Sequence, residues 1–528
     1  MKNTLDGTSG RRAQPSPRLP NELLIDVFHA FDSGLQKGHV QKKARPRCRW
    51  ISLMLVCRHW RALGVSTPSL WQVIEVGDNL RWVKLALARS AFLPIRLLFT
   101  DRFSESRTLS FMIPHKERIQ MIVVDRSQTC PPPLQLLFHY PLPLLSEVDI
   151  ATDGAAENSN MPHLCFAEHP MLRTLRLSFY PLPFDDSMFA QLHSMSLSDK
   201  VFYSKLLTLE DFSSALRRCA RLKELRLHRV LRHLANFNPA PATESAVVAL
   251  PKLRKLVIED HPWTTSSFLP KLDLSPQVTL RLCIQWPGGL SDALYTESFD
   301  SLLPIDRSNI PILRSITNAS IDCWHDSKVA LKGRTDDAKI TLKIAGSIRD
   351  PGTFYLQEAQ EQFRILFDGA PLECLEIAGD WDVVPDIHHY LRFFAGYPAL
   401  RSLKVSGCGS PTTLLRAFIE YQPYPAITTM HLSDSRSGSA ESMFLICPHL
   451  SSLALKYVKW RQEFIDILLL VLRRRLEYGL PKLKELVLLA KSESPTQELS
   501  DTQLWRVLDA HLGDLQSLVT KLNYELVN

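Results

Sequence analysis

The chain has 528 residues, of which 45% are hydrophobic and 22% charged, a composition typical of globular proteins that excludes a fibrous or wholly disordered chain. Its formal net charge of +7 is concentrated at the amino end, because residues 1–61 hold 12 of the 62 Lys and Arg residues but only 4 of the 55 Asp and Glu residues. There is no run of about 20 apolar residues and no apolar signal-peptide core in residues 1–18, so we expect neither a membrane span nor export by that route.

The first helical pattern follows a polar, basic tail over residues 1–17, which we expect to be disordered. The stretch LPNELLIDVFHAF (19–31) predicts a helix that begins at Pro20 and has a wide apolar face. The basic insert Lys37 to Arg49 comes next, and we interpret it as a solvated loop, with a nuclear-import or nucleic-acid patch as the alternative. Because no aromatic residue is interleaved in its basic run to stack on bases, nucleic-acid binding is not expected.

A second helix is predicted by the spacing of an apolar stripe that consists of Leu53, Val56, Cys57, Trp60 and Leu63. Gly64 is expected to end this helix, and Thr67-Pro68 to begin a further turn. Cys57 and His59 are two residues apart and do not face each other on a helix, so we expect no nucleophilic chemistry here. So many large apolar groups on short helices leave apolar surface exposed, which is typical of one side of an interface.

Residues 18–76 resemble the F-box, in the pieces L-P-x-E-L-L, V-C-R-x-W-R and a closing L-W, found here in that order. The resemblance implies a helical motif that docks a Skp-type adaptor, which in turn links it to a cullin–RING ubiquitin ligase. It does not tell which residues contact the adaptor and which pack internally, and a plain helical hairpin that caps the following repeats is the alternative. The implied adaptor-binding residues are Leu19, Pro20, Leu23, Leu24, Val27, Phe28, Val56, Cys57, Trp60, Leu63, Leu70 and Trp71. The basic insert Lys37 to Arg49 is long for this family and could modify docking.

Residues 77–140 are predicted to form helix–strand units. The stretch NLRWVKLALARSAFLPIRLLFT (79–100) is similar to the helix and strand that follow the F-box in many fungal F-box proteins with degenerate leucine-rich repeats.

From residue 141 to 498 the chain repeats the phrase L-x-x-L-x-L, usually preceded by proline. In L-x-L both apolar residues point to the same side of a strand, and one such unit cannot bury its apolar face alone, so the units must stack. A period in the twenties to thirties is typical of leucine-rich repeats. The phrases are Leu145-Val148-Ile150, Leu172-Leu175-Leu177, Leu222-Leu225-Leu227, Leu253-Leu256-Ile258, Leu372-Leu375-Ile377, Leu400-Leu403-Val405, Ile427-Met430-Leu432, Leu450-Leu453-Leu455 and Leu483-Leu486-Leu488.

Between phrases the spacers predict helices, as at 410–418 and 464–472. Gly369, Gly396 and Gly479 stand where each helix would need a left-handed residue. The segment from Leu282 to Ser347 shows strands without a clear phrase, and an ordinary α/β domain is the alternative to repeats. Residues 499–528 predict a helix that caps the stack, with Asp501 as its N-cap.

The expected fold is therefore α/β: a small N-terminal helical F-box, an irregular leucine-rich-repeat solenoid and a C-terminal capping helix. The expected function is the substrate-recognition subunit of a Skp–cullin–F-box ubiquitin ligase, with an unknown protein target; the alternative is a non-degradative scaffold or nuclear protein. Nucleotide-binding and hydrolase motifs are absent, so we expect no enzyme activity of the chain's own and no cofactor. Asp380-Trp381-Asp382 with His388-His389 is interpreted as a loop and helix start rather than a metal site. Ten cysteines without a C-x-x-C pair favour reduced, buried thiols in the cytoplasm or nucleus.

Overall fold

The structure, a computed structural model, divides into two compact units, Met1–Met188 (unit 1) and Phe189–Asn528 (unit 2). The basic tail, the basic insert up to residue 48 and the phrase around Met430 lie outside the residues that it describes. The predicted domain boundaries stay predictions. The described residues are 19–33, 49–100, 107–127, 132–152, 168–179, 189–199, 208–234, 247–285, 299–324, 328–345, 356–379, 386–407, 411–419, 446–458, 462–491 and 498–527.

Unit 1 starts with short helices and continues with strands and helices in alternation. Its elements are α1 (Asn21–Ser33), η1 (Arg49–Leu55), α2 (Arg58–Ser66), η2 (Pro68–Trp71), β1 (Val73–Val76), α3 (Leu80–Arg89), β2 (Ile95–Phe99), α4 (Arg107–Met112), η3 (Ile113–Arg118), β3 (Ile119–Ser127), α5 (Pro132–Leu137), β4 (Glu147–Thr152) and β5 (Thr174–Ser178), where η marks a 3-10 helix. The strands pair in parallel and in chain order, β1 with β2, then β3, β4 and β5. The predicted helix and strand between residues 79 and 100 are confirmed as α3 and β2.

Unit 2 also alternates strands and helices. Its elements are β6 (Ser194–Ser198), α7 (Leu209–Arg217), β7 (Glu224–His228), η5 (Leu231–His233), β8 (Val248–Ala249), β9 (Lys255–Asp260), α8 (Pro262–Phe268), η6 (Leu269–Lys271), β10 (Leu272–Asp273), β11 (Thr279–Gln285), η7 (Phe299–Leu302), α9 (Ile312–Ser315), β12 (Asn318–Trp324), β13 (Lys328–Arg334), β14 (Lys339–Ala345), α10 (Leu356–Leu366), β15 (Cys374–Gly379), α11 (Ile387–Ala395), β16 (Ser402–Ser406), α12 (Thr412–Ala417), β17 (Ser452–Val458), α13 (Gln462–Glu477), β18 (Glu485–Lys491), α14 (Glu498–Leu518) and β19 (Leu522–Val527).

The main sheet of unit 2 is mostly parallel, with one antiparallel interruption. Strands β6, β7, β9 and β11 pair in parallel in that order. The neighbour of β11 is then β14, which pairs in parallel with it, and β14, β13 and β12 form an antiparallel meander. Parallel pairing resumes between β12 and β15 and continues through β16, β17, β18 and β19. The meander explains why the sequence between Leu282 and Ser347 shows strands without the phrase.

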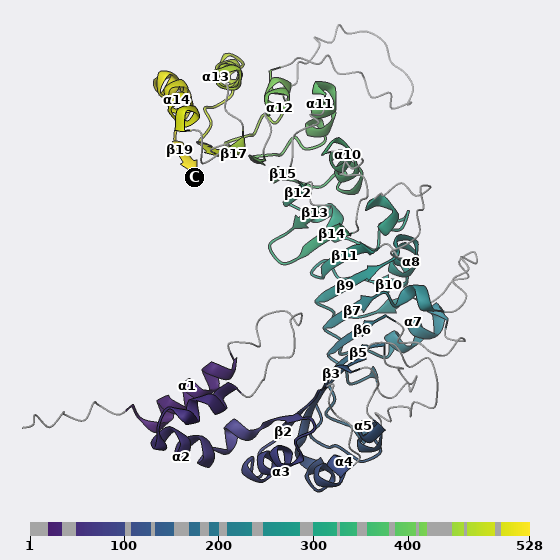
Figure 1. The fold of residues 1–528 in the computed structure, drawn as a ribbon. Coiled ribbons are helices and arrows are strands. Elements are labelled where there is room, and N and C mark those ends of the chain that lie inside the picture. Colours follow the sequence, from purple (N-terminus) through teal and green to yellow (C-terminus); the bar gives the residue numbers. More distant parts are fainter. Residues whose placement is uncertain are drawn as a thin grey trace, which may run out of the picture. The chain divides into compact units, whose positions relative to one another are not determined.

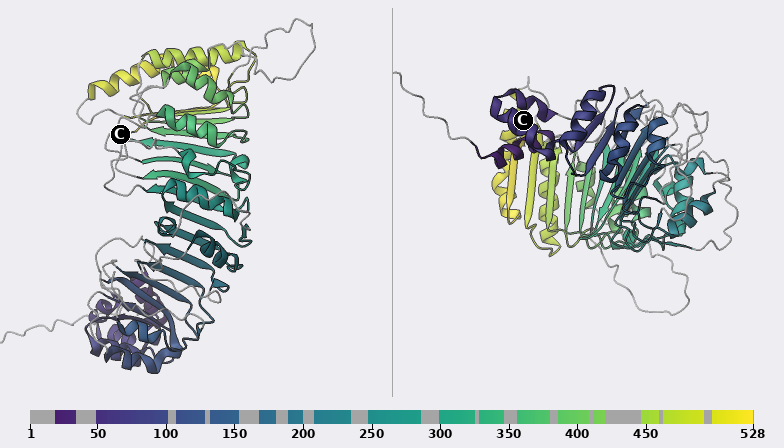
Figure 2. Two further views of the ribbon diagram at one scale, coloured as in Figure 1. Left: turned by 90° about the vertical axis from the view of Figure 1, so that its right-hand side faces the viewer. Right: turned by 90° about the horizontal axis from the view of Figure 1, so that it is seen from below.

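The apolar residues of the repeated phrases stack on one face of this sheet. Leu225 and Leu227 of β7 are in register with Leu256 and Ile258 of β9, and all four are at most 1% exposed. The helices of unit 2 cover the same face, and Figure 1 and Figure 2 show no described helix of this unit on the opposite face. The strand predictions for the described phrases are therefore confirmed, and the sheet has one buried face and one open face.

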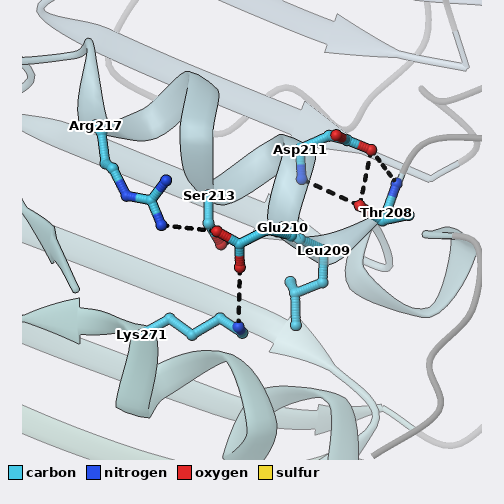
Figure 3. A network of polar contacts seen from close by, with 7 residues as sticks. All are labelled: Thr208, Leu209, Glu210, Asp211, Ser213, Arg217 and Lys271. Atoms are coloured by element: carbon cyan, nitrogen blue, oxygen red, sulfur yellow. Dashed lines mark hydrogen bonds and ion pairs between the residues drawn. The ribbon is translucent and has the colours of Figure 1, made fainter. Parts of the chain in front are cut away.

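Helix ends in unit 2 follow local hydrogen bonding. At the start of α7 the side chain of Thr208 accepts a hydrogen bond from the backbone N–H of Asp211, while the Asp211 carboxylate accepts one from the backbone N–H of Thr208 (Figure 3). This reciprocal capping satisfies two backbone donors that a helix start leaves without partners. Glu210 in the first turn also accepts hydrogen bonds from Arg217 and from Lys271 of η6, which ties α7 to the next layer.

Three predictions about helix ends in unit 2 need comment. Gly369 and Gly479 have φ of 71° and 74°, as predicted. Gly396 was predicted to be left-handed, but its φ is −70° and its N–H bonds back to carbonyls of α11, so that prediction is wrong. Asp501 is not an N-cap, because α14 begins at Glu498, and the carboxyl end is a helix followed by strand β19 rather than a capping helix alone. None of the described helices is long and apolar enough to cross a membrane.

Candidate functional site

The helices that open unit 1 pack around a cluster of aromatic rings. Phe28 of α1 lies 6.2 Å from Trp50 of η1 and 5.5 Å from Trp60 of α2, between ring centroids. Trp50 meets Trp71 of η2 edge to face at 5.0 Å. Phe28, Trp50 and Trp71 are at most 2% exposed, so these rings are the core of a small helical module.

Trp71 also joins this module to the strand and helix that follow. Its Nε1–H donates a 2.8 Å hydrogen bond to the carbonyl of Gly64 in α2. Its ring lies 5.3 Å from the ring of Trp82 in α3, and the guanidinium of Arg89 lies over it at 4.6 Å. Since β1 starts two residues later, the helical module and the first strand–helix unit share one core.

The second helix differs from its prediction at both ends. Residues 49–55 form a 3-10 helix, and Cys57 has extended backbone (φ −160°, ψ 172°), so it is the N-cap of α2 and not part of a continuous helix. Gly64 was expected to end the helix, but α2 continues to Ser66. A Cβ on Gly64 would come within 2.9 Å of the Met54 side chain, so the glycine allows close packing of α2 on η1. The predicted turn after Thr67 is confirmed as η2.

Helix α1 carries two apolar rows, each with a spacing of four residues. The row of Leu24 and Phe28 is buried, at 3% and 0% exposure. The other row begins with Leu19 just before the helix and is exposed along its whole length; it consists of Leu19 (53%), Leu23 (50%), Val27 (39%) and Phe31 (46%). Residues four apart lie on one side of a helix, so these side chains form a continuous apolar stripe in contact with water. We call it the α1 stripe.

A second exposed apolar pair lies where η1 meets α2. Leu55 and Val56 are 76% and 62% exposed. The adjoining Cys57 is exposed as well, and so are the basic side chains of Arg58 and Arg61 on α2. An apolar surface next to cations suits a partner that offers apolar groups flanked by carboxylates.

The structure thus divides the residues implied by the resemblance into three groups. Leu24, Phe28, Leu70 and Trp71 are buried in the module, and Trp60 and Leu63 are half-buried. Those open to a partner are Leu19, Pro20, Leu23, Val27, Val56 and Cys57. Sequence reasoning missed Trp50 as a core residue and Leu55 as an exposed one. It placed Phe31 on the apolar face of the first helix but not among the adaptor-binding residues, and the four-residue spacing from Leu19 was the signal that could have added it.

The structure describes only part of the Asp380–His389 cluster that the sequence singled out. Asp380 and Asp382 lie outside them, and the buried His389 is the third residue of α11, which starts after its N-cap, Asp386. Its Nε2 lies 3.0 Å from the amide oxygen of Gln360, and burial lowers its pKa. Within the described part of the chain, no group of three or more His, Cys, Asp or Glu residues is arranged to hold a metal ion.

Comparison with protein families finds one matching model, F-box-like, over residues 16–75. The matched residues include the whole helical module, from Leu19 before α1 to Trp71 in η2, and most of β1. The chain therefore carries an F-box-like domain, which supports its being an F-box protein. Comparison with curated proteins finds no matching sequence.

Proposed function

We propose that this protein is the substrate-recognition subunit of a Skp–cullin–F-box type ubiquitin ligase. The observation that carries the proposal is the α1 stripe, which is exposed on the F-box-like domain although the same helix buries its other apolar row. An exposed apolar stripe on a well-packed module is typical of a protein interface. The occupant we assign to it is a Skp-type adaptor, the partner that F-box domains typically bind.

We further propose that the rest of the chain is an array of degenerate leucine-rich repeats whose open sheet face binds the target protein. The in-register stacking of Leu225 and Leu227 on Leu256 and Ile258, and the helices on one face only, support this interpretation. The ligase would act by proximity, because a target held close to a charged ubiquitin carrier has a high effective concentration there. The chain itself would perform no chemistry and would need no cofactor, and it would work in the cytoplasm, the nucleus or both.

Co-purification with a Skp-type adaptor tests the proposal. The chain would be co-expressed with the adaptor as wild type and as the variant Leu23→Asp/Val27→Asp, which places charges in the α1 stripe without disturbing buried residues. The matched control is Phe92→Asp/Leu144→Asp, which changes two exposed apolar residues of unit 1 outside the F-box-like domain. We expect the wild type and the control to retain the adaptor in equal amounts and the stripe variant to lose it.

If the folded wild-type chain captures no adaptor, the domain is a structural cap and the proposal is wrong. If the adaptor is captured but the reconstituted ligase transfers no ubiquitin to proteins bound by unit 2, the scaffold function takes its place.

A further inference from the structure

The open face of the unit 2 sheet is basic where β11, β14 and β13 lie side by side. Alternate residues of these strands point to the open face, opposite Leu282, Leu342 and Leu331, which are fully buried. Among the described residues of the three strands, this face carries no acidic side chain. The cations on this face whose side chains the structure describes are Arg281 on β11, Lys339 and Lys343 on β14, and Lys332 and Arg334 on β13.

Two of these five cations are neutralised by acids on the flanking strands. Arg281 forms an ion pair with Glu259 of β9 at 3.1 Å, and Lys332 pairs with Asp322 of β12. Elsewhere on the open face Glu224 of β7 pairs across strands with Lys255 of β9 and within its own strand with Arg226, and Lys404 of β16 pairs across strands with Glu376 of β15. Pairing of opposite charges, mostly across strands, is therefore the rule on the described part of this face.

Arg334, Lys339 and Lys343 depart from that rule. None of the three has an ion-pair partner among the described residues. Arg334 and Lys339 stand directly opposite each other in the antiparallel pair, an arrangement of like charges that destabilises a sheet. The turn between the two strands contains Asp336 and Asp337, but it lies beyond the strand ends and neither carboxylate pairs with these cations. No described carboxylate therefore neutralises the three charges, and they are exposed or half-buried on a face that no described helix covers (Figure 1).

We propose that Arg334, Lys339 and Lys343 form the centre of a docking site for an acidic peptide segment of the target protein. This inference rests on the proposed function, which assigns target binding to the open face, and adds the chemistry of the bound segment. Carboxylates of such a segment would supply the counter-charges that the sheet lacks.

The size and composition of this basic face favour a peptide over a nucleic acid. Three adjacent strands span about 10 Å, and residues two apart along a strand are separated by about 6.8 Å, which matches a few residues of an extended peptide. No aromatic side chain stands among the described open-face positions of β11, β14 and β13, and the neighbouring β12 has a single one, Trp324 at its end, so bases would not find the row of rings on which single strands stack. Thr341 lies beside the cations and can donate a hydrogen bond to a carboxylate.

Fluorescence anisotropy of short labelled probes on the full-length chain tests the site. The probes are a peptide of alternating glutamate and serine, its lysine–serine counterpart and a single-stranded oligonucleotide of similar length. The variant is Arg334→Gln/Lys339→Gln/Lys343→Gln. The control, Arg416→Gln/Arg473→Gln/Arg474→Gln, removes three positive charges from exposed helix positions of the same unit.

We expect the glutamate peptide to bind the wild type and the control equally, and the site variant at least about tenfold more weakly. The binding should weaken with added salt, and the lysine peptide should not bind. Amide hydrogen exchange in β13 and β14 of the site variant should be unchanged or slower, because the variant loses the opposed like charges. The proposal would be overturned if the glutamate peptide did not bind, or if the site variant and the control lost affinity for it to the same extent. If the oligonucleotide bound the same residues more tightly than the peptide, the ligand of the site would be a nucleic acid instead. Adaptor capture, measured on the same preparations, should be the same in the wild type, the site variant and the control. A failure of adaptor binding is therefore distinguished from a failure of peptide binding.

Discussion

The two apolar rows of α1 predict opposite outcomes for substitutions at neighbouring positions. Leu23 and Val27 are 50% and 39% exposed, whereas Leu24 is 3% exposed. Complete burial of an aliphatic side chain is worth roughly 2 kcal/mol, so covering the exposed part of Leu23 and Val27 gains about 1 kcal/mol each. The variant Leu23→Ala/Val27→Ala should therefore bind the adaptor about thirtyfold more weakly, a change of about 2 kcal/mol. The free energy of unfolding of this variant should change by less than about 0.5 kcal/mol.

Leu24→Ala should show the reverse. It leaves a cavity against the aromatic cluster and should cost about 2–5 kcal/mol of local stability. A chain of this length does not unfold in a single two-state step, so a global melting curve would not isolate the effect. Amide hydrogen exchange of α1 followed by mass spectrometry measures the local stability, and calorimetric titration with the adaptor measures the affinity.

Adaptor binding by Leu23→Ala/Val27→Ala as tight as that of the wild type would contradict the assignment of the exposed row to the interface. Faster exchange in α1 of this variant, rather than of Leu24→Ala, would contradict the assignment of the other row to the core.

The remaining predictions concern single contacts. Trp71→Phe removes the 2.8 Å hydrogen bond to a buried carbonyl of α2 and should cost about 1–3 kcal/mol, seen as faster exchange in α2 and α3 while β9 is unchanged. Thr208→Ala should cost about 1 kcal/mol of local stability in α7, and Thr208→Ser should restore most of it. The hydrogen bonds from the backbone N–H and the side chain of Thr208 lower the pKa of Asp211, so their contribution to α7 is complete above the ordinary value of 3.8 and is lost as the pH falls through the lowered pKa. Exchange protection of α7, corrected for intrinsic rates, should drop in that acid range in the wild type and should not do so in Asp211→Asn, which has no carboxylate to protonate. Iodoacetamide at pH 8 should modify the exposed Cys57 and spare Cys447, because burial raises the pKa of Cys447 to about 12. Bound adaptor should slow the reaction at Cys57. Equal labelling of both thiols would contradict the burial of Cys447.

The sequence predicted helices and strands correctly where the spacing of the apolar residues fits only one type of element. The phrase around Leu225 predicts a strand with two buried residues, and the stripe around Leu468 predicts α13, because both patterns depend only on which side of the element is buried. They failed where two backbone conformations fit the same spacing. Leu53 to Leu63 has helical spacing, yet extended backbone at Cys57 separates a 3-10 helix from α2. Gly396 is compatible with either sign of φ, and hydrogen bonds to α11 select the negative one.

The candidate site was predictable in position but not in orientation. Sequence reasoning indicated a wide apolar face on α1, and the resemblance placed a docking surface there. Which row of that face is buried depends on where Trp50 and Trp60 lie in space, and this information is not local to the helix. The basic face of unit 2 was not predicted, although Arg334, Lys339 and Lys343 stand within ten residues of one another in the chain. Which acids flank these cations depends on the pairing of β14 with β11 and of β13 with β12, and local spacing does not give that pairing.

The meander in unit 2 has a consequence for the synthesis of the protein. In a regular array each new strand pairs with the one made just before it, so that folding can follow the growing chain. Here the neighbour of β11 is β14, and β12 and β13 cannot take that place. The sheet therefore cannot grow past Gln285 until Ala345 has been added, a delay of roughly 3–12 s at about 5–20 residues per second. During that interval β11 has an open edge, and an open strand edge is where a nascent chain is most exposed to pairing with the wrong strand.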